Sequence, residues 1–222
     1  MNDDGKPDLV ASLSNSNTVS VLPGNGDGTF AAGNSYAVGT SPGGIAVVDL
    51  NGDGRLDVVT ANYLSDNVSV LLADGSGGFH AAVHYDTGAQ PSAVAVADLN
   101  GDGKPDIVTA DKGYPGISVL LGNGDGTFAP AQGVGAGGGK ASVAVADLNG
   151  DGKADIATAN FYSDDVSVLL GRGDGTFDEP LTFPAGDGPT DIAIADLNGD
   201  GRPDLVVTND FDHNVSVLLN EP

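Results

Sequence analysis

The 222-residue sequence contains no cysteine, no tryptophan, one methionine and only two glutamates. The lack of cysteine excludes a disulfide framework and a thiolate metal site. No apolar run approaches the roughly 20 residues that a membrane-spanning helix needs. The first residues lack the basic start and apolar stretch of a signal peptide. Eight basic residues against 31 acidic ones give a net charge of −23, which argues against a nucleic-acid partner.

Aspartate and glycine dominate the polar part of the composition. All 31 acidic residues except Glu179 and Glu221 are aspartates, and 35 residues are glycines. Aspartate is the short carboxylate of turns and of sites for hard cations. A hydrophobic content of 40% favours a packed core over a disordered chain.

One acidic segment recurs at a fixed interval along the chain. Residues 49–57, with the sequence DLNGDGRLD, return in closely similar form at residues 98–106, 147–155 and 196–204, so the period is 49 residues. Such a period without insertions indicates duplication of a single structural unit. We therefore interpret the chain as one domain or fragment of about four and a half repeats, with approximate units 1–41, 42–90, 91–139, 140–188 and 189–222.

Each repeat is expected to contain four short strands. In the third repeat, residues 92–98 contain the uninterrupted apolar run 93–97, which predicts a first strand buried on both faces. Residues 107–110 and 117–121 predict the second and third strands, a fourth starts near Phe128, and residues 133–139 cross to the next unit. No segment shows a helical period. Four strands in about 40–50 residues predict an all-β fold, a β-propeller of four-stranded antiparallel blades.

The two end repeats are incomplete. The first is expected to lack its first strand and the last its fourth strand, so five blades are present, two of them three-stranded. In a propeller, the first strands would line the central channel and the fourth strands the rim. We interpret the chain as part of a larger ring, with a compact ring of five blades as the alternative.

The acidic segments have the pattern of a cation-binding loop. Positions one, three, five and nine offer side-chain oxygens, and position seven offers a backbone carbonyl, which leaves its own side chain free to vary. The predicted metal ligands are Asp49, Asn51, Asp53, Arg55 and Asp57; Asp98, Asn100, Asp102, Lys104 and Asp106; Asp147, Asn149, Asp151, Lys153 and Asp155; and Asp196, Asn198, Asp200, Arg202 and Asp204.

Six or seven oxygen ligands suit Ca²⁺ better than Mg²⁺, zinc or copper. The glycines at positions four and six permit the backbone turns that such wrapping needs. Carboxylates about 4 Å apart repel by roughly 4 kcal/mol per pair in an intermediate dielectric, which favours a bound cation. A plain hairpin turn is the alternative, but it would not require aspartate at positions one and nine of every complete copy. We predict about four calcium sites; a fifth at Asn2, Asp4 and Asp8 is weakened by the missing first aspartate.

These motifs resemble the FG-GAP/VCBS repeats of bacterial surface proteins and of the integrin α-subunit propeller. The resemblance covers essentially the whole chain and rests on two elements: the DGTF sequence at residues 27–30, 125–128 and 174–177, and segments such as IAIADLNGDGRPD at residues 192–204. It implies a propeller, usually of about seven blades, whose nine-residue loops hold Ca²⁺ at one face through the aspartate and asparagine positions given above.

Other features of the sequence have simpler explanations. The loops between second and third strands carry aromatic residues beside asparagine and aspartate, namely Tyr63, Tyr114, Phe161, Tyr162 and Phe211. This composition suits sugar binding, although packing between blades is the simpler expectation. The tripeptide at residues 172–174 reads RGD, but it fills a strand turn that reads NGD one repeat earlier. The three histidines lie at unrelated phases and indicate no shared site.

Two functional hypotheses follow from these patterns. The first is a non-catalytic, calcium-binding module of an extracellular or cell-surface protein, used for adhesion or for recognition of a glycan or protein ligand. Its partners would include neighbouring blades or domains of a longer parent chain. We expect no nucleic-acid partner and no membrane-spanning segment. The alternative is the propeller domain of a secreted carbohydrate-active enzyme, a lyase or hydrolase in which paired aspartates would act as acid and base.

Overall fold

The computed structural model describes residues 1–2, 4–113 and 116–221. Within them the chain forms strands and no helix, and hence no helix that could cross a membrane. The first sheet contains β1 (Leu9–Leu13), β2 (Thr18–Leu22) and β3 (Asn34–Ala37). The second contains β4 (Pro42–Val48), β5 (Asp57–Asn62), β6 (Asn67–Leu71) and β7 (Val83–Asp86).

The remaining three sheets repeat this order. The third contains β8 (Pro91–Ala97), β9 (Asp106–Asp111), β10 (Gly116–Leu120) and β11 (Gln132–Gly135). The fourth contains β12 (Lys140–Ala146), β13 (Asp155–Asn160), β14 (Asp165–Leu169) and β15 (Leu181–Pro184). The fifth contains β16 (Pro189–Ala195), β17 (Asp204–Asn209) and β18 (Asn214–Leu218). Every pairing within these sheets is antiparallel.

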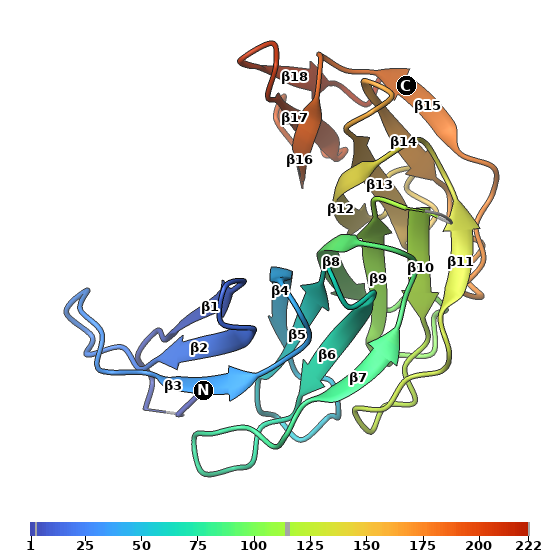
Figure 1. Cartoon of the computed structure of the whole chain (residues 1–222). Coiled ribbons are helices and arrows are strands. Elements are labelled where there is room, and N and C mark those ends of the chain that lie inside the picture. Colours follow the sequence, from blue (N-terminus) through green and yellow to red (C-terminus); the bar gives the residue numbers. More distant parts are fainter. Residues whose placement is uncertain (3, 114–115, 222) are drawn as a thin grey trace.

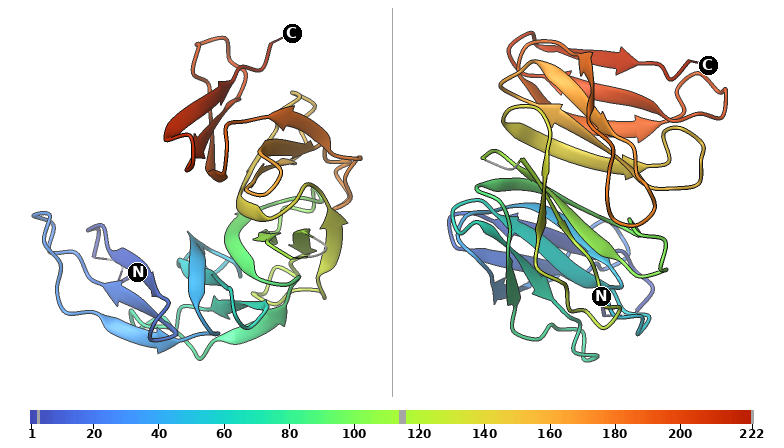
Figure 2. Two further views of the ribbon diagram at one scale, coloured as in Figure 1. Left: turned by 45° about the horizontal axis from the view of Figure 1, so that its top comes forward. Right: turned by 90° about the vertical axis from the view of Figure 1, so that its right-hand side faces the viewer.

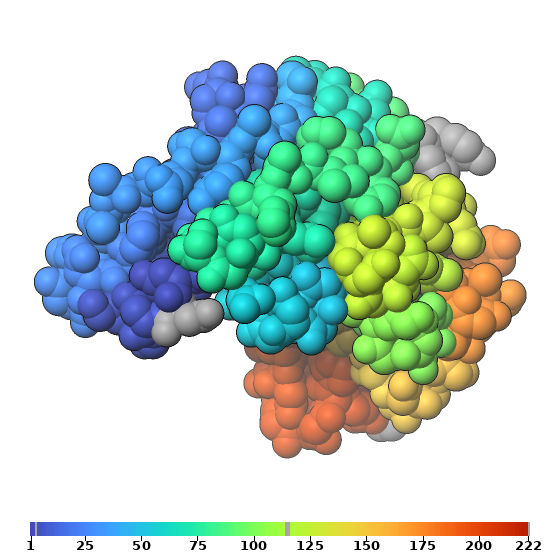
Figure 3. Space-filling model, turned by 90° about the horizontal axis from the view of Figure 1, so that it is seen from below, coloured from blue at the N-terminus to red at the C-terminus, as the bar shows by residue number. Residues whose placement is uncertain are grey.

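The five sheets follow one another around an open arc (Figure 1). The strands β4, β8, β12 and β16 lie on the inner side of the arc, and β3, β7, β11 and β15 lie on its outer side. The first and last sheets stand apart in both views of Figure 2, so the arc does not close. Figure 3 shows successive repeats lying against one another in sequence order.

The core consists of apolar side chains packed between neighbouring sheets. Val59 and Val68 of the second sheet pack with Ile107 and Leu120 of the third, and all four are essentially inaccessible to solvent. The second and third strands of the three middle sheets are buried on both faces, because each sheet is covered by another on either side. Alternating Val, Ile and Leu on these strands explain both their extended backbone and their burial.

The strand order of each repeat and the two three-stranded end sheets agree with the sequence prediction. Two details of the third repeat differ. Its first strand, β8, is only half-buried beyond Pro91, because it faces the inner side of the arc. Its fourth strand begins at Gln132 rather than near Phe128, so part of the predicted crossing segment is strand. Phe128 instead makes an isolated bridge with Gly122, and its ring is buried between sheets.

A buried pair of charged residues interrupts the repeat symmetry. Asp111 replaces the asparagine of the other complete repeats, and Lys140 replaces their proline; both are fully buried. The Asp111 carboxylate accepts hydrogen bonds from Ser118 Oγ at 2.6 Å and Thr109 Oγ1 at 2.7 Å. The Lys140 ammonium donates to the carbonyl oxygens of residues 136 and 137. Burial raises the pKa of Asp111 and lowers the pKa of Lys140 to about 8.

Candidate metal centre

The four complete acidic loops occupy one end of the sheets, each between the first and second strands of its repeat. Residues 49–57 connect β4 to β5, and the loops at residues 98–106, 147–155 and 196–204 connect the equivalent strands. Gly52 and Gly54 adopt φ values of +74° and +81°, a region that side chains with a Cβ rarely enter. The sequence therefore forms a tight loop that presents several oxygens from few residues.

The ninth residue of each loop is a buried carboxylate that connects two parts of the repeat. Both oxygens of Asp57 accept backbone hydrogen bonds, from Leu50 N at 2.9 Å and from Ala73 N at 2.8 Å. Asp106 makes the same pair of bonds with Leu99 and Gly122. Burial raises the pKa of Asp57 and of Asp106, and the carboxylates at loop positions five and one raise it further. Three negative groups therefore lie close together in each of these two loops.

The first, third and fifth residues turn their oxygens towards the backbone of their own loop. Asp49 accepts hydrogen bonds from Gly52 N and Gly54 N, both at 2.8 Å. Asn51 Oδ1 accepts from Asp53 N at 3.0 Å. The same contacts recur in the other three complete loops.

The seventh residue pairs with the fifth. The distances are 3.2 Å for Arg55–Asp53, 3.3 Å for Lys104–Asp102, 3.2 Å for Lys153–Asp151 and 2.8 Å for Arg202–Asp200. These pairs are partly exposed, so solvent screens them. The lysine stem also lies over the turn between the third and fourth strands, since a Cβ on Gly124 would lie 2.9 Å from Lys104 Cδ.

The donor set is chemically suited to a hard divalent cation, because each loop combines carboxylate and amide oxygens. Among the described residues, no group of three or more His, Cys, Asp or Glu side chains is already arranged to hold a metal ion. The hydrogen bonds explain why the side chains do not converge on one centre, because the oxygens at positions one, three and five face the amides of their own loop. A cation would have to replace some of these bonds, so the four calcium sites stay a prediction.

The incomplete first loop differs from the others. The amino group of Met1 lies 3.1 Å from Asp8 Oδ2, and Asn2 N donates to the same oxygen at 3.3 Å. Asp8 Oδ1 accepts from Gly24 N at 2.9 Å, so the ninth residue keeps its structural contact. Both oxygens of Asp8 thus have contacts, and a fifth metal would have to displace those on Oδ2.

Family models of known proteins agree with this repeat structure. The FG-GAP-like repeat matches four overlapping segments, residues 1–60, 49–109, 98–158 and 147–207. The chain belongs to the FG-GAP-like repeat family. No curated protein matches it.

Several solved structures resemble the FG-GAP-like arc. The Vibrio cholerae biofilm matrix protein Bap1 has a TM-score of 0.59 and 22% identity, over 99% of this chain and 36% of Bap1. A putative 6-phosphogluconolactonase from Bacteroides uniformis has a TM-score of 0.65 and 18% identity, over 94% and 66%. BBS1N, crystallised with ARL6DN, has a TM-score of 0.63 and 12% identity, over 100% and 66%. At these identities the likeness shows the propeller-like fold alone. The chain spans between about one third and two thirds of these proteins.

An aromatic residue wedged between neighbouring sheets is a feature of the FG-GAP-like repeats that the sequence did not reveal. The Phe79 ring lies 5.2 Å from the Tyr36 ring of the preceding sheet, and the Phe128 ring lies 5.5 Å from Tyr85. Both pairs meet edge to face. Phe79 and Phe128 thereby join their own sheets to the previous ones, whereas Phe30 of the first sheet is 44% exposed. The 49-residue recurrence of this phenylalanine was the signal that could have predicted the contact.

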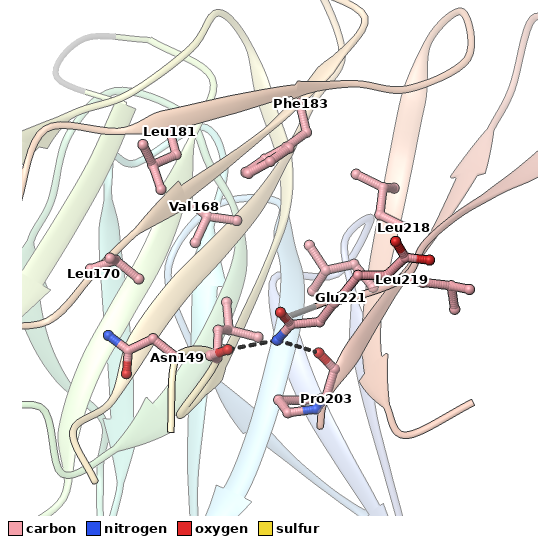
Figure 4. Close-up of a pocket in the computed structure, with 12 residues that line it drawn as sticks. Asn149, Val168, Leu170, Leu181, Phe183, Pro203, Leu218, Leu219 and Glu221 are labelled. Carbon is pink, nitrogen blue, oxygen red and sulfur yellow. Dashed lines mark hydrogen bonds between the residues drawn. The ribbon is translucent and has the colours of Figure 1, made fainter. Parts of the chain in front are cut away.

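The equivalent place between the fourth and fifth sheets is a cavity of about 460 Å³. Figure 4 shows its apolar lining, which includes Val168, Leu170, Leu181, Phe183 and Leu218. Phe183 stands at the repeat position of Tyr36 and Tyr85 and is 40% exposed. The outer edge of β18 beside it pairs with no described strand.

The other candidate residues do not form a shared site. Arg172 of the RGD sequence pairs with Asp178 at 2.8 Å across its own turn. Of the histidines, His84 Nδ1 lies 2.9 Å from Ser69 Oγ. Tyr114 lies outside the described residues. The predicted burial of aromatics between repeats is wrong for Tyr162 and Phe211, which are 70% and 59% exposed because both lie at the open ends of their loops.

Proposed function

We propose that this chain is a calcium-stabilised, non-catalytic recognition module of an extracellular or cell-surface protein. The observation that carries the proposal is the fourfold recurrence of one oxygen-rich loop at the same end of consecutive sheets. In each loop, positions one, three, five and nine would hold the ion, with the carbonyl of position seven. The ion would neutralise the crowded carboxylates and connect the first two strands of the repeat.

An extracellular setting supports this proposal. Extracellular modules bind calcium with dissociation constants of about 10⁻⁴–10⁻³ M, near the calcium concentration outside cells. An intracellular protein would meet far less free calcium, and its carboxylates would remain uncompensated. Adhesion or ligand recognition is the role that we propose for the module.

Thermal unfolding in excess calcium and in excess EDTA tests the metal. Each site should add about 2.7 kcal/mol to the stability at calcium concentrations near one hundred times its dissociation constant. We therefore expect the melting temperature to fall markedly in EDTA and to recover when calcium is restored, with magnesium as the control ion. Identical melting curves in calcium and EDTA would contradict the proposal.

We further propose that the arc forms part of a β-propeller ring. The cavity between the fourth and fifth sheets and the open edge of β18 fit the turn and fourth strand of another FG-GAP-like repeat, supplied by a longer parent chain or a neighbouring domain. A synthetic peptide of residues 171–187 carries such a segment. It should bind the protein, and the same peptide with Phe177→Ala should not; equal binding of both peptides would argue against this use of the cavity.

A further inference from the structure

Two exposed aromatic rings lie at the end of the sheets opposite the acidic loops. Tyr162 follows β13 and Phe211 follows β17, at the same position of consecutive repeats. They are 70% and 59% exposed. Two large aromatic side chains this exposed at one end of the sheets offer a ligand an apolar surface to contact.

Each of the two rings lies over a glycine. A Cβ on Gly188 would lie 2.8 Å from Phe211 Cδ2, and a Cβ on Gly139 would overlap the ring of Tyr162. The repeat position of Gly139 and Gly188 is occupied by Ser41 and Gln90 in the two repeats that lack the aromatic residue. These two residues have φ values of 56° and 60°. The backbone conformation therefore does not require glycine there. The glycines make room for the rings.

The backbone that carries the two rings is anchored by hydrogen bonds. Tyr162 N donates to Gly138 O at 3.3 Å, and Phe211 N donates to Asp187 O at 3.2 Å. The Phe161 ring contacts both, with centroids 5.4 Å from the Tyr162 ring and 5.4 Å from the Phe211 ring. An anchored backbone loses little conformational entropy on binding, which favours affinity.

Carboxylates lie beside the loop that carries the Phe211 ring. Asp164 Oδ1 accepts from Gly188 N at 2.9 Å, and Asp212 Oδ2 accepts from Asp187 N at 2.9 Å. Partial desolvation raises the pKa of the exposed Asp187, and the neighbouring charges of Asp164 and Asp212 add to this effect, so the three groups are close. Each keeps lone pairs that can accept hydrogen bonds from hydroxyl groups.

Positive charge is scarce at this end of the sheets. The connecting loops carry no arginine and one lysine, Lys112, and the nearby Lys140 at the start of β12 is buried. The Lys112 ammonium lies 5.5 Å from the Tyr63 ring and 5.9 Å from the Phe161 ring. An anionic polymer would therefore meet carboxylates here without a compensating cluster of cations.

We propose that Tyr162 and Phe211 form a platform that binds a neutral polysaccharide, whose sugar rings stack on the aromatic faces while their hydroxyls donate to the neighbouring carboxylates. A pyranose ring has an apolar face and a polar edge, which matches flat rings bordered by acceptors. A protein partner would instead favour a contiguous apolar core. The inference specifies the recognition role proposed above and rests on it, but it does not depend on calcium.

Affinity electrophoresis through gels that contain a neutral β-glucan, mannan or xylan tests the platform, with alginate as the polyanionic comparison. At least one neutral polymer should retard the protein, and alginate should not. Tyr162→Ala and Phe211→Ala should each weaken binding about tenfold, a loss comparable to that of one aromatic ring stacked on a nucleic-acid base. Tyr162→Phe should retain binding, and Leu64→Ala, at the same position of the second repeat, is the matched control.

Melting curves of each variant establish that it is folded, and the gels are run in both calcium and EDTA. No retardation by any neutral polymer overturns the inference, as does binding that survives the Tyr162→Ala/Phe211→Ala double variant. An EDTA-insensitive melt with ring-dependent retardation would reject calcium and keep the platform. An EDTA-sensitive melt without retardation would do the reverse.

Discussion

The two ends of the sheets differ in how faithfully the repeats copy one another. At the acidic-loop end, the four complete loops share their hydrogen bonds, their ion pairs and nearly all their residues. At the opposite end, one position carries Leu64, Gly113, Tyr162 and Phe211 in successive repeats.

This contrast separates two kinds of constraint. A contact that every repeat needs in order to fold must be kept in every copy, whereas a ligand can be bound by a few copies. The acidic-loop end therefore carries the structural contacts, and the opposite end is free to specialise. Four predictions, ordered by the size of the expected effect, test this division between the two ends.

The largest effect should come from an aromatic ring at the acidic-loop end. Phe128→Ala removes a ring that is 7% exposed and packed against Tyr85, so we expect a loss of about 3–5 kcal/mol in unfolding free energy. Tyr162→Ala, at the opposite end, should change stability by less than about 0.5 kcal/mol. Urea denaturation measures both. Equal losses would remove the distinction between the two ends.

The buried ninth carboxylate should be structural as well as metal-binding. Asp106→Ala leaves the amides of Leu99 and Gly122 without their acceptor, at a cost of about 2–4 kcal/mol. This loss should persist in EDTA, because the hydrogen bonds do not require the ion. Asp98→Ala, at the first position of the same loop, should lose stability chiefly in calcium. Urea denaturation of both variants with and without EDTA separates the two roles.

The buried Lys140 should make stability depend on pH. Its pKa falls from 10.5 to about 8 on folding because burial disfavours the ammonium, while the charges of Asp111 and Asp165 oppose that shift. Between these values the unfolded chain binds the proton and the folded chain does not, so stability rises with pH. The slope is at most about 1.4 kcal/mol per pH unit.

Melting curves from pH 7 to 10 should show this rise in the wild type and lack it in Lys140→Met. The remaining lysines and the tyrosines are common to both proteins, so the difference between the two curves reports Lys140. If the stability of the two proteins changed with pH in parallel, the ammonium of Lys140 would have the pKa of a solvent-exposed lysine, and the prediction would be wrong.

The smallest effect concerns the glycine beneath a ring. Gly188→Ser should cost about 1 kcal/mol, because the new Cβ displaces the Phe211 ring. In a Phe211→Ala background the same substitution should cost much less, since Ser41 already occupies the equivalent position. A double-mutant cycle by urea denaturation measures the coupling. Additive effects would show that ring and glycine are independent.

The sequence predicted the local features of the fold and of the site. Strand alternation, the 49-residue period and the loop pattern at residues 49–57 all act over short distances, so the strand order and the positions of the acidic loops could be predicted. The bond from Ala73 to Asp57 could not, because Ala73 lies 16 residues away and meets Asp57 only after β5 and β6 have paired.

Contacts between repeats were also missed. The wedge of Phe128 against Tyr85 and the burial of Lys140 near Asp111 depend on how one sheet covers the next. A single repeat carries no direct information on that covering. Comparison of equivalent positions across repeats does carry information on contacts between sheets. Asp111 stands where other repeats have asparagine, and Lys140 stands where they have proline, so both positions depart from the repeat pattern.

The neighbour-only packing of the arc has a mechanical consequence. The close contacts between sheets join consecutive members, such as β4 with β8 and β8 with β12. An array linked in this way loses cooperativity as it lengthens, and its outermost members, covered on one side, fray first. Amide hydrogen exchange should therefore be fastest in β1 and β18 and slower towards the middle of the arc. The amides of the third sheet should exchange last.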